Sequence, residues 1–305
     1  MHLGDGRHEY DWIDDWIELP TPERGVDNGR THGIAVTGDD RVVVFRQADP
    51  AVLVYDRSGS LLDSWGNQYL GAHGLTLVEE DGDERLWLVD QDTAAIEKRT
   101  LAGELVASIS QPPHPAYEDG SFVPTWVATA GGDAAVWIAD GYGESLVHRY
   151  DADGIYQDTI DGTAGAGRFD CPHAAYIDER GTGRQLYIAD RGNERLQVYD
   201  EDGSYLRSAG ADALTSPCTL DVYDGDCVVP ELYARVTILD EDDEVITHLG
   251  ANEAVVDRDD WPNVNEDVIE PGRFNSPHDA AFDSAGNLYV AEWIVGGRVT
   301  KLERT

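Results

Sequence analysis

The chain contains three histidines at the same step of a repeated sequence pattern. Each is the second residue of a strand-like opening: His73 in AHGLTL, His173 in PHAAYI and His278 in PHDAAF. Three neutral imidazoles that meet at one point form the ligand set of a catalytic zinc ion with an open fourth position. Imidazole also suits Cu, Fe and Ni, so these histidines alone leave the metal open. The alternative is that each histidine only caps a turn in a loop.

The pattern has six copies, and the other three openings carry different residues at this step. THGIAV, PTWVAT and PCTLDV place His32, Thr125 and Cys218 there, and the six openings recur at spacings of 41 to 60 residues. Such a period is typical of an array built from one supersecondary unit. If the copies close into a ring, the histidines of copies two, four and six lie about 120° apart. His32 breaks this alternation and is either a spectator or a wall of the pocket. Cys218 is either a ligand or a small buried residue.

Residues near the ends of the repeated strands could add acid–base chemistry. Tyr142, in DGYGES, follows the second strand of the third copy, and Arg46 and Arg191 are assigned to the same step of the first and fourth copies. A phenol and two guanidinium groups suit an anionic substrate and a proton transfer. Each arginine could instead form a surface or inter-blade ion pair. Asp279 directly follows His278 and points toward the centre of the ring or caps its loop.

Four short strands in each copy must position these residues. The second strands read RVVVFRQ, RLWLVDQ, AVWIADG, QLYIADR, DCVVPEL and NLYVAEW, with hairpin turns such as DEDG between later strands. The last copy ends after three strands, and residues 9–20, EYDWIDDWIELP, can supply its fourth. The sequence therefore predicts an all-β fold, a six-bladed β-propeller closed by this N-terminal strand, with a single domain over 1–305. The long connection 250–277, which carries Trp261, is either a lid or a solvated insertion.

Composition restricts the partners and the compartment. The chain has 60 acidic and 22 basic residues, a net charge of −38, and the acidic residues occur in every repeat. This spread indicates a solvated surface in the salt-rich cytoplasm of a halophile, with an acidic docking face as the alternative. The negative charge disfavours nucleic acid as a partner.

Without a long apolar run or a basic, apolar start, we expect neither a membrane span nor a secretory signal. Three sparse cysteines fit a reducing interior. Histidines 114, 148 and 248 lie off the pattern, and we expect them at the surface.

Taken together, these segments resemble the NHL-repeat propellers, and within them the peptidyl-α-hydroxyglycine α-amidating lyase. The resemblance covers roughly residues 30–304. AHGLTL, CPHAAYID and SPHDAAFD resemble the family's zinc-binding segments, which implies zinc ligands at His73, His173 and His278. DGYGES resembles the segment of the catalytic tyrosine, which implies that role for Tyr142. The family has a disulfide cysteine after this tyrosine, and Gly143 stands here.

The resemblance also implies a reaction and further site residues. VVVFRQ and ADRGNER imply that Arg46 and Arg191 hold the substrate carboxylate, and Asp279 is counted with the catalytic residues. A structural calcium ion is implied at the carbonyls of Ile34 and Leu75 and the carboxylate of Asp279. The expected substrate is a small anionic carbinolamide, an N-acyl- or ureido-α-hydroxyglycine, cleaved to an amide and glyoxylate. We expect no covalently linked monooxygenase domain, so a ureidoglycolate-type substrate suits an intracellular setting.

Two other functions are consistent with a propeller. One is a non-catalytic NHL-repeat module that binds a protein partner, because propellers host many functions. The other is a calcium-dependent sugar-lactone hydrolase, which requires Glu, Asn and Asp ligands where this pattern offers histidines. About one zinc ion per chain favours the lyase, and its absence favours the interaction module.

Overall fold

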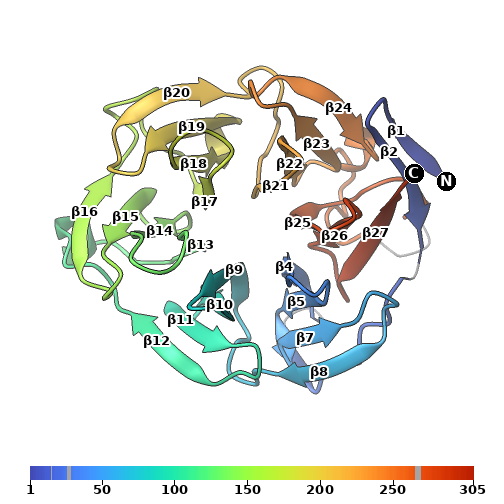
Figure 1. The fold of residues 1–305 in the computed structure, drawn as a ribbon, viewed down its shortest axis with the longest axis horizontal. Coiled ribbons are helices and arrows are strands. Elements are labelled where there is room, and N and C mark those ends of the chain that lie inside the picture. The colour runs from blue at the N-terminus through green and yellow to red at the C-terminus, as the bar shows by residue number, and fades with distance from the viewer. Residues whose placement is uncertain (15, 26–28, 265–268) are drawn as a thin grey trace. The chain divides into compact units, whose positions relative to one another are not determined.

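The structure, a computed structural model, describes residues 1–14, 16–25, 29–264 and 269–305. The described strands form six antiparallel sheets of four or five strands and one two-stranded ribbon (Figure 1). The chain divides into two compact units, with residues 1–70 and 213–305 in unit 1 and residues 71–212 in unit 2. Each unit contains three of the large sheets, which are numbered as blades one to six in chain order. The predicted six-bladed β-propeller is therefore confirmed, whereas the single domain stays a prediction.

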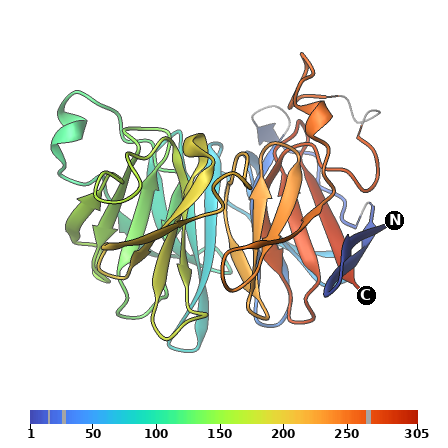
Figure 2. The same cartoon turned by 90° about the horizontal axis from the view of Figure 1, so that it is seen from above.

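Unit 2 contains blades two, three and four. Blade two consists of β9 (Ala72–Glu80), β10 (Asp83–Asp90), β11 (Ala95–Thr100) and β12 (Leu105–Ile109). Blade three consists of β13 (Trp126–Ala128), β14 (Val136–Asp140), β15 (Leu146–Tyr150) and β16 (Tyr156–Ile160). Blade four consists of β17 (Pro172–Asp178), β18 (Gln185–Asp190), β19 (Arg195–Asp200) and β20 (Tyr205–Ala209). The short 3-10 helices η2 (Pro115–Glu118) and η3 (Arg191–Asn193) lie at the same end of these blades (Figure 2).

Unit 1 contains blades one, five and six. Blade one consists of β4 (Thr31–Val36), β5 (Val42–Arg46), β7 (Val52–Tyr55) and β8 (Leu61–Trp65). Blade five consists of β21 (Asp221–Tyr223), β22 (Asp226–Glu231), β23 (Arg235–Leu239) and β24 (Val245–Leu249). Blade six has the order β1 (His2–Asp5), β2 (His8–Ile13), β27 (Arg298–Arg304), β26 (Leu288–Glu292) and β25 (Pro277–Phe282). The ribbon pairs β3 (Arg24–Gly25) with β6 (Ala48–Asp49), and η4 (Glu253–Val255) lies in the connection before blade six.

Burial falls from the inner to the outer strands of a blade. In blade one, every residue of β5 is buried, whereas four of the five residues of β8 are exposed. A strand covered on both faces reads as a continuous apolar run, which explains the VVVF of β5. Its side chains pack with those of blade six in one cluster that includes Val44, Leu53, Tyr289 and Ala291. The inner strands are therefore rigid supports for the residues that precede and follow them.

The N-terminal strand completes blade six, as the sequence predicts, but it is shorter than predicted. Residues 10–13 of β2 pair with β27, with Trp12 opposite Leu302. The expected strand over 9–20 is wrong after Ile13, and residue 15 lies outside the described residues. The chain leaves the sheet because its next segment binds blade one instead. The Trp16 indole donates to the carbonyl of Arg57, and the Tyr55 hydroxyl donates to the carbonyl of Glu18.

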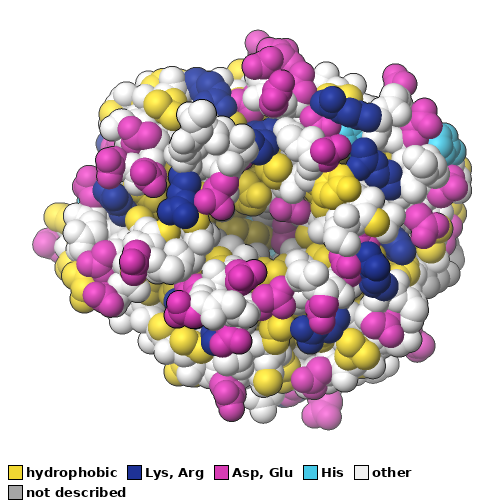
Figure 3. Space-filling view, in the orientation of Figure 1, with side chains coloured by type: hydrophobic (Ala, Val, Ile, Leu, Met, Phe, Trp, Pro, Cys, Tyr) yellow, Lys and Arg dark blue, Asp and Glu magenta, His cyan; other side chains and the backbone are white. Residues whose placement is uncertain are grey.

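Acidic side chains are scattered over the face seen in Figure 3, with Lys and Arg interspersed among them. This agrees with acidic residues that solvate the surface broadly. Within the ranges that the structure describes, no helix has the length and apolar character needed to cross a membrane.

Candidate functional site

A buried carboxylate ends the second strand of five blades and holds the loop that leads into the same blade. It accepts a backbone N–H of that loop at 2.5 to 2.9 Å. The pairs, acceptor last, are Gly71–Asp90, Val123–Asp140, Asp170–Asp190, Thr215–Glu231 and Asn275–Glu292. All five carboxylates are fully buried, where a charged acceptor makes a strong hydrogen bond. In these five blades, the contact fixes where the opening strand begins. It therefore also fixes the position of the second residue of that strand.

In unit 2, four of the predicted site residues lie together around the hydroxyl of Tyr142. That oxygen lies 3.1 Å from Nε2 of His73 and 3.2 Å from Nε2 of His173. Arg191 donates to it from Nη2 at 3.3 Å, with the guanidinium over the phenol ring. The two histidine ring centroids are 4.8 Å apart. Both histidines are fully buried, whereas Tyr142 is 39% exposed, so the cluster has a buried base and an accessible phenol.

The hydrogen bonds of His73 determine which of its nitrogens can bind a ligand. Nδ1 lies 2.9 Å from the carbonyl oxygen of Thr125, and a carbonyl only accepts, so Nδ1 carries the proton. Nε2 of a neutral ring then presents its lone pair toward Tyr142. Burial lowers the pKa of His73 to about 3, and the Arg191 charge acts in the same direction, which keeps the ring neutral. A histidine that is oriented by a backbone carbonyl through one nitrogen is the usual form of a metal ligand.

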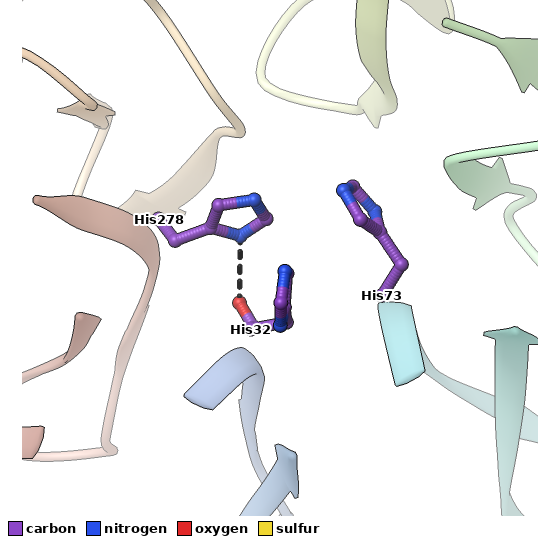
Figure 4. Close-up of side chains that lie close together, drawn as sticks. All are labelled: His32, His73 and His278. Carbon is purple, nitrogen blue, oxygen red and sulfur yellow. Dashed lines mark hydrogen bonds between the residues drawn. The ribbon is translucent and has the colours of Figure 1, made fainter. Parts of the chain in front are cut away.

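In unit 1, His278 repeats this arrangement. Its Nδ1 lies 2.9 Å from the carbonyl oxygen of His32 and therefore donates to it (Figure 4). The two imidazole rings meet edge to face with centroids 4.5 Å apart, and both side chains are buried. Nε2 of His278 is thus left with its lone pair, as it is in His73.

The chain therefore offers imidazole donors for a metal ion in both units. Among the described residues, three buried histidines each present a ring nitrogen that could hold such an ion: His32, His73 and His278. The set includes His32, which the sequence left as a spectator or a pocket wall. The predicted zinc site of His73, His173 and His278 stays a prediction, although the donor chemistry fits zinc.

Asp279 is held inside unit 1 by three hydrogen bonds. Its carboxylate accepts the Ile34 N–H at 2.7 Å, the Thr219 hydroxyl at 2.7 Å and its own neighbour's N–H, that of Ala280, at 2.9 Å. Burial raises the pKa of Asp279 to about 8, because a charged carboxylate is costly away from water. The group of Ile34 that contacts this carboxylate is thus its backbone N–H, whereas the expected calcium ligand is its carbonyl. Leu75 lies in β9 of unit 2, opposite Leu88. The calcium site stays a prediction.

The two predicted substrate arginines do not occupy the same step of their blades. Arg46 pairs with Thr31 across blade one, whereas the residue that pairs with Pro172 across blade four is Asp190. The assignment of Arg46 and Arg191 to one step is therefore wrong by one residue. Arg46 is the last residue of β5, whereas Arg191 lies in η3 after the end of β18, so the two guanidinium groups have different surroundings. Arg46 occupies the step at which the other five blades have a carboxylate.

Arg46 is buried and bound to the backbone of unit 1. It donates from Nε to the carbonyl of Pro50 at 3.0 Å and from Nη1 to that of Pro20 at 2.6 Å. Its Nη2 has no hydrogen-bond partner among the described residues. Burial lowers the pKa of Arg46. A role in holding the substrate carboxylate stays a prediction.

The sequence missed a group of polar residues beside Tyr142. His148, expected at the surface, is fully buried in β15. Its Nε2 lies 2.6 Å from the hydroxyl of Tyr117, which donates to Asp140 at 2.7 Å. His114 is partly exposed and His248 is exposed. The missed signal is the alternation of β15, LVHRY, which places His148 on the same face as Leu146 and Tyr150.

Trp261, in the long connection before blade six, packs onto blade five. Its indole donates to the carbonyl of Asn275 at 3.0 Å, and its ring lies 5.7 Å from that of Tyr233. The connection also buries Val255 and Val264 against Ala234. This part of the connection is therefore packed, whereas residues 265–268 of the same connection lie outside the described residues.

Comparisons with known proteins confirm the predicted resemblance at the level of weak sequence similarity. NHL repeat-containing protein 3 of Homo sapiens is 26% identical over 198 residues, which cover 58% of this chain and 54% of that protein. Peptidyl-glycine alpha-amidating monooxygenase of Mus musculus is 24% identical over 209 residues, which cover 57% of this chain and 21% of that protein. The chain thus spans about half the length of the first of these relatives, and less of the second. No protein-family model matches the chain.

Solved structures support the fold alone. A streptogramin B lyase structure superposes over 100% of this chain and 98% of its own, with a TM-score of 0.62 and 13% identity. The gluconolactonase XC5397 from Xanthomonas campestris covers 93% of this chain and 88% of its own, with a TM-score of 0.61 and 15% identity. Propellers of this kind thus include enzymes, and these identities are too low to transfer an activity.

Proposed function

We propose that the protein is a zinc-dependent lyase that cleaves an N-acyl- or ureido-α-hydroxyglycine to an amide and glyoxylate. In R–CO–NH–CH(OH)–COO⁻ the C–N bond breaks, and its electron pair stays on nitrogen. The hydroxyl loses its proton as the aldehyde of glyoxylate forms, and the nitrogen gains one proton. The reaction is balanced without an oxidant, a reductant or water.

The observation that carries this proposal is the position of the Tyr142 hydroxyl. Nε2 of His73, Nε2 of His173 and Nη2 of Arg191 all lie within 3.1 to 3.3 Å of this oxygen. A phenol beside two imidazoles and a guanidinium can exchange a proton with a bound substrate at hydrogen-bond distance. As the phenolate, Tyr142 would accept the hydroxyl proton and return it to the leaving nitrogen.

Arg191 would bind the substrate carboxylate. Its guanidinium is held over the Tyr142 ring, so a carboxylate on this arginine lies beside the phenol oxygen. Guanidinium binds carboxylate through two parallel N–H donors, which also orients the reacting carbon. Arg46 would be a second carboxylate ligand, as the resemblance implies.

The zinc ion would be held by His73 and His173 of unit 2, with His278 as the third ligand that the resemblance implies. Bound there, zinc would supply a Lewis acid that lowers the pKa of the substrate hydroxyl. The support from this chain is the orientation of its rings, because His73 and His278 each use Nδ1 on a backbone carbonyl. Asp279, together with the carbonyls of Ile34 and Leu75, would hold calcium in a structural role.

The substrate class is supported by the weak similarity to a peptidyl-glycine alpha-amidating monooxygenase. The similarity covers 21% of that protein, so it supports the cleavage of the carbinolamide alone. A ureido group in place of the acyl group preserves the same carbinolamide, so ureidoglycolate is a second candidate substrate. A cytoplasmic location in a salt-accumulating organism, as the composition suggests, would favour the ureido compound.

The test is to measure zinc and glyoxylate with the same preparation. We expect about one zinc ion per chain, and glyoxylate release from α-hydroxyhippurate or ureidoglycolate that stops on chelation and returns with zinc. A zinc-loaded protein that releases glyoxylate from neither compound would refute the proposed reaction. A protein that binds no zinc would favour the interaction module.

A further inference from the structure

Tyr142 stands in a turn that the side chain of Asp140 closes. Oδ2 of Asp140 accepts the N–H of Glu144, four residues later, at 2.7 Å, and Oδ1 accepts the N–H of Val123 at 2.7 Å. The Tyr142 N–H donates to the carbonyl of Val123 at 3.4 Å. One carboxylate thus ties the turn to the loop that precedes β13.

The same turn packs directly on this carboxylate at Gly143. A Cβ atom at position 143 would lie 2.2 Å from Oδ1 of Asp140 and 2.3 Å from the carbonyl oxygen of Ser121. No side chain fits there unless the carboxylate or the loop moves. The position of the turn that carries Tyr142 therefore depends on where the Asp140 carboxylate lies.

Asp140 is in turn held by a chain of hydrogen bonds that runs in one direction. Tyr117, in η2, donates its hydroxyl proton to Oδ2 of Asp140 at 2.7 Å, so the bond at 2.6 Å to Nε2 of His148 must be donated by the histidine. The other ring nitrogen, Nδ1, then accepts from Thr159 Oγ1 at 2.8 Å. The Thr159 oxygen lies 2.8 Å from the hydroxyl of Tyr156.

Burial keeps the histidine of this chain neutral. Asp140 and His148 are fully buried, and desolvation lowers the pKa of His148 to about 3. The imidazole is therefore neutral and has one donor and one acceptor, both used in the chain. Buried polar groups that lose a partner are costly, so each member restrains the next.

We propose that Tyr117 is a positioning residue for Tyr142 and acts through Asp140. Its hydroxyl belongs to η2 and contacts neither His73 nor Arg191 in the hydrogen bonds described above, so its effect on the reaction passes through the turn. Without this hydroxyl, Oδ2 of Asp140 and Nε2 of His148 lose their shared partner, and the turn moves. The consequence for catalysis rests on the proposed function, whereas the consequence for the position of Tyr142 does not.

The test is Tyr117→Phe in protein labelled with 3-fluorotyrosine, with the Tyr142 signal identified by its loss in Tyr142→Phe. We expect Tyr117→Phe to shift or split the Tyr142 fluorine signal. We also expect kcat for glyoxylate release to fall about tenfold or more, with KM within about twofold. Tyr150→Phe is the matched control, because this buried tyrosine of β15 donates to the Ser110 carbonyl at 2.9 Å, outside the chain of bonds. The control should leave the Tyr142 signal in place.

An unchanged Tyr142 signal in Tyr117→Phe would overturn the proposal, whatever the activity. If Tyr117→Phe moves the Tyr142 signal and the wild-type protein releases no glyoxylate, the positioning role is supported and the proposed reaction is refuted. Thr159→Val is a second variant, which removes the donor to Nδ1 of His148 at the far end of the chain. We expect it to move the Tyr142 signal less than Tyr117→Phe does, and no movement would count against the proposal.

Discussion

Nδ1 of His73 donates a hydrogen bond of 2.9 Å to the carbonyl oxygen of Thr125, which occupies the same step of the next blade. His278 makes the equivalent bond to His32 within unit 1. In both units, the repeat thus orients an imidazole through the backbone of the neighbouring blade and leaves Nε2 to bind a ligand. Because the acceptor is a backbone carbonyl, the arrangement requires no particular residue type at the accepting position, which is threonine in one case and histidine in the other.

The first prediction concerns metal binding by His73. His73→Ala removes a proposed ligand, so we expect zinc content and glyoxylate release to be lost together, with metal affinity lowered by at least about 100-fold. Zinc can be measured by elemental analysis after dialysis against a weak chelator. His248→Ala, at an exposed histidine, is the control and should retain both properties. A His73→Ala protein with full zinc content would contradict the ligand assignment.

The second prediction concerns the pH dependence of stability caused by His148. Burial lowers the pKa of His148 from 6.5 to about 3, so the folded chain binds fewer protons at this site than the unfolded chain. Its contribution to stability is present above pH 6.5 and is lost as the pH falls toward 3, by about 1.4 kcal/mol for each pH unit. In urea unfolding, the stability difference between wild type and His148→Gln should therefore shrink below pH 6.5. A difference that stays constant down to pH 4.5 would show that His148 is not buried in neutral form.

The third prediction concerns the N-terminal strand. Trp12 is buried in β2, and its ring lies 4.8 Å from that of Phe274, whereas the neighbouring Asp11 is exposed. Trp12→Ala should lower the free energy of unfolding by about 3 to 5 kcal/mol, and Asp11→Ala by less than about 0.5 kcal/mol. Denaturant unfolding of both variants tests this pair. Equal effects would mean that Trp12 of β2 is not buried in blade six.

The fourth prediction concerns salt. A net charge of −38 opposes the folded state by self-repulsion, and the screening length falls from about 10 Å at 0.1 M to about 3 Å at 1 M salt. We therefore expect the unfolding temperature to rise when KCl is increased from 0.1 to about 2 M. Sucrose serves as an uncharged control for general effects of cosolutes. A protein that is most stable at low salt would contradict a halophilic adaptation.

The sequence predicted the blades because each copy repeats one pattern of apolar strands and turns. It placed Tyr142 and Arg191 at the same end of the blades as His73 and His173, and these four residues lie together in unit 2. The assignment of the two arginines to one step was wrong, because RVVVFRQ aligned with QLYIADR places Arg46 at the step of Asp190, one residue before Arg191. The role of Tyr117 could not be predicted, because it lies in a connection outside the repeat and its partner His148 belongs to a different strand.

Proton transfer by Tyr142 is tested most directly by comparing glyoxylate release by zinc-loaded Tyr142→Phe with that by wild type. Tyr233→Phe is the matched control, because Tyr233 follows Glu231 as Tyr142 follows Asp140, and both tyrosines are 39% exposed. We expect Tyr142→Phe to keep its zinc and to lose kcat by about 100-fold to 10,000-fold, while Tyr233→Phe retains activity. Turnover by Tyr142→Phe at the rate of wild type would show that this phenol does not transfer the proton.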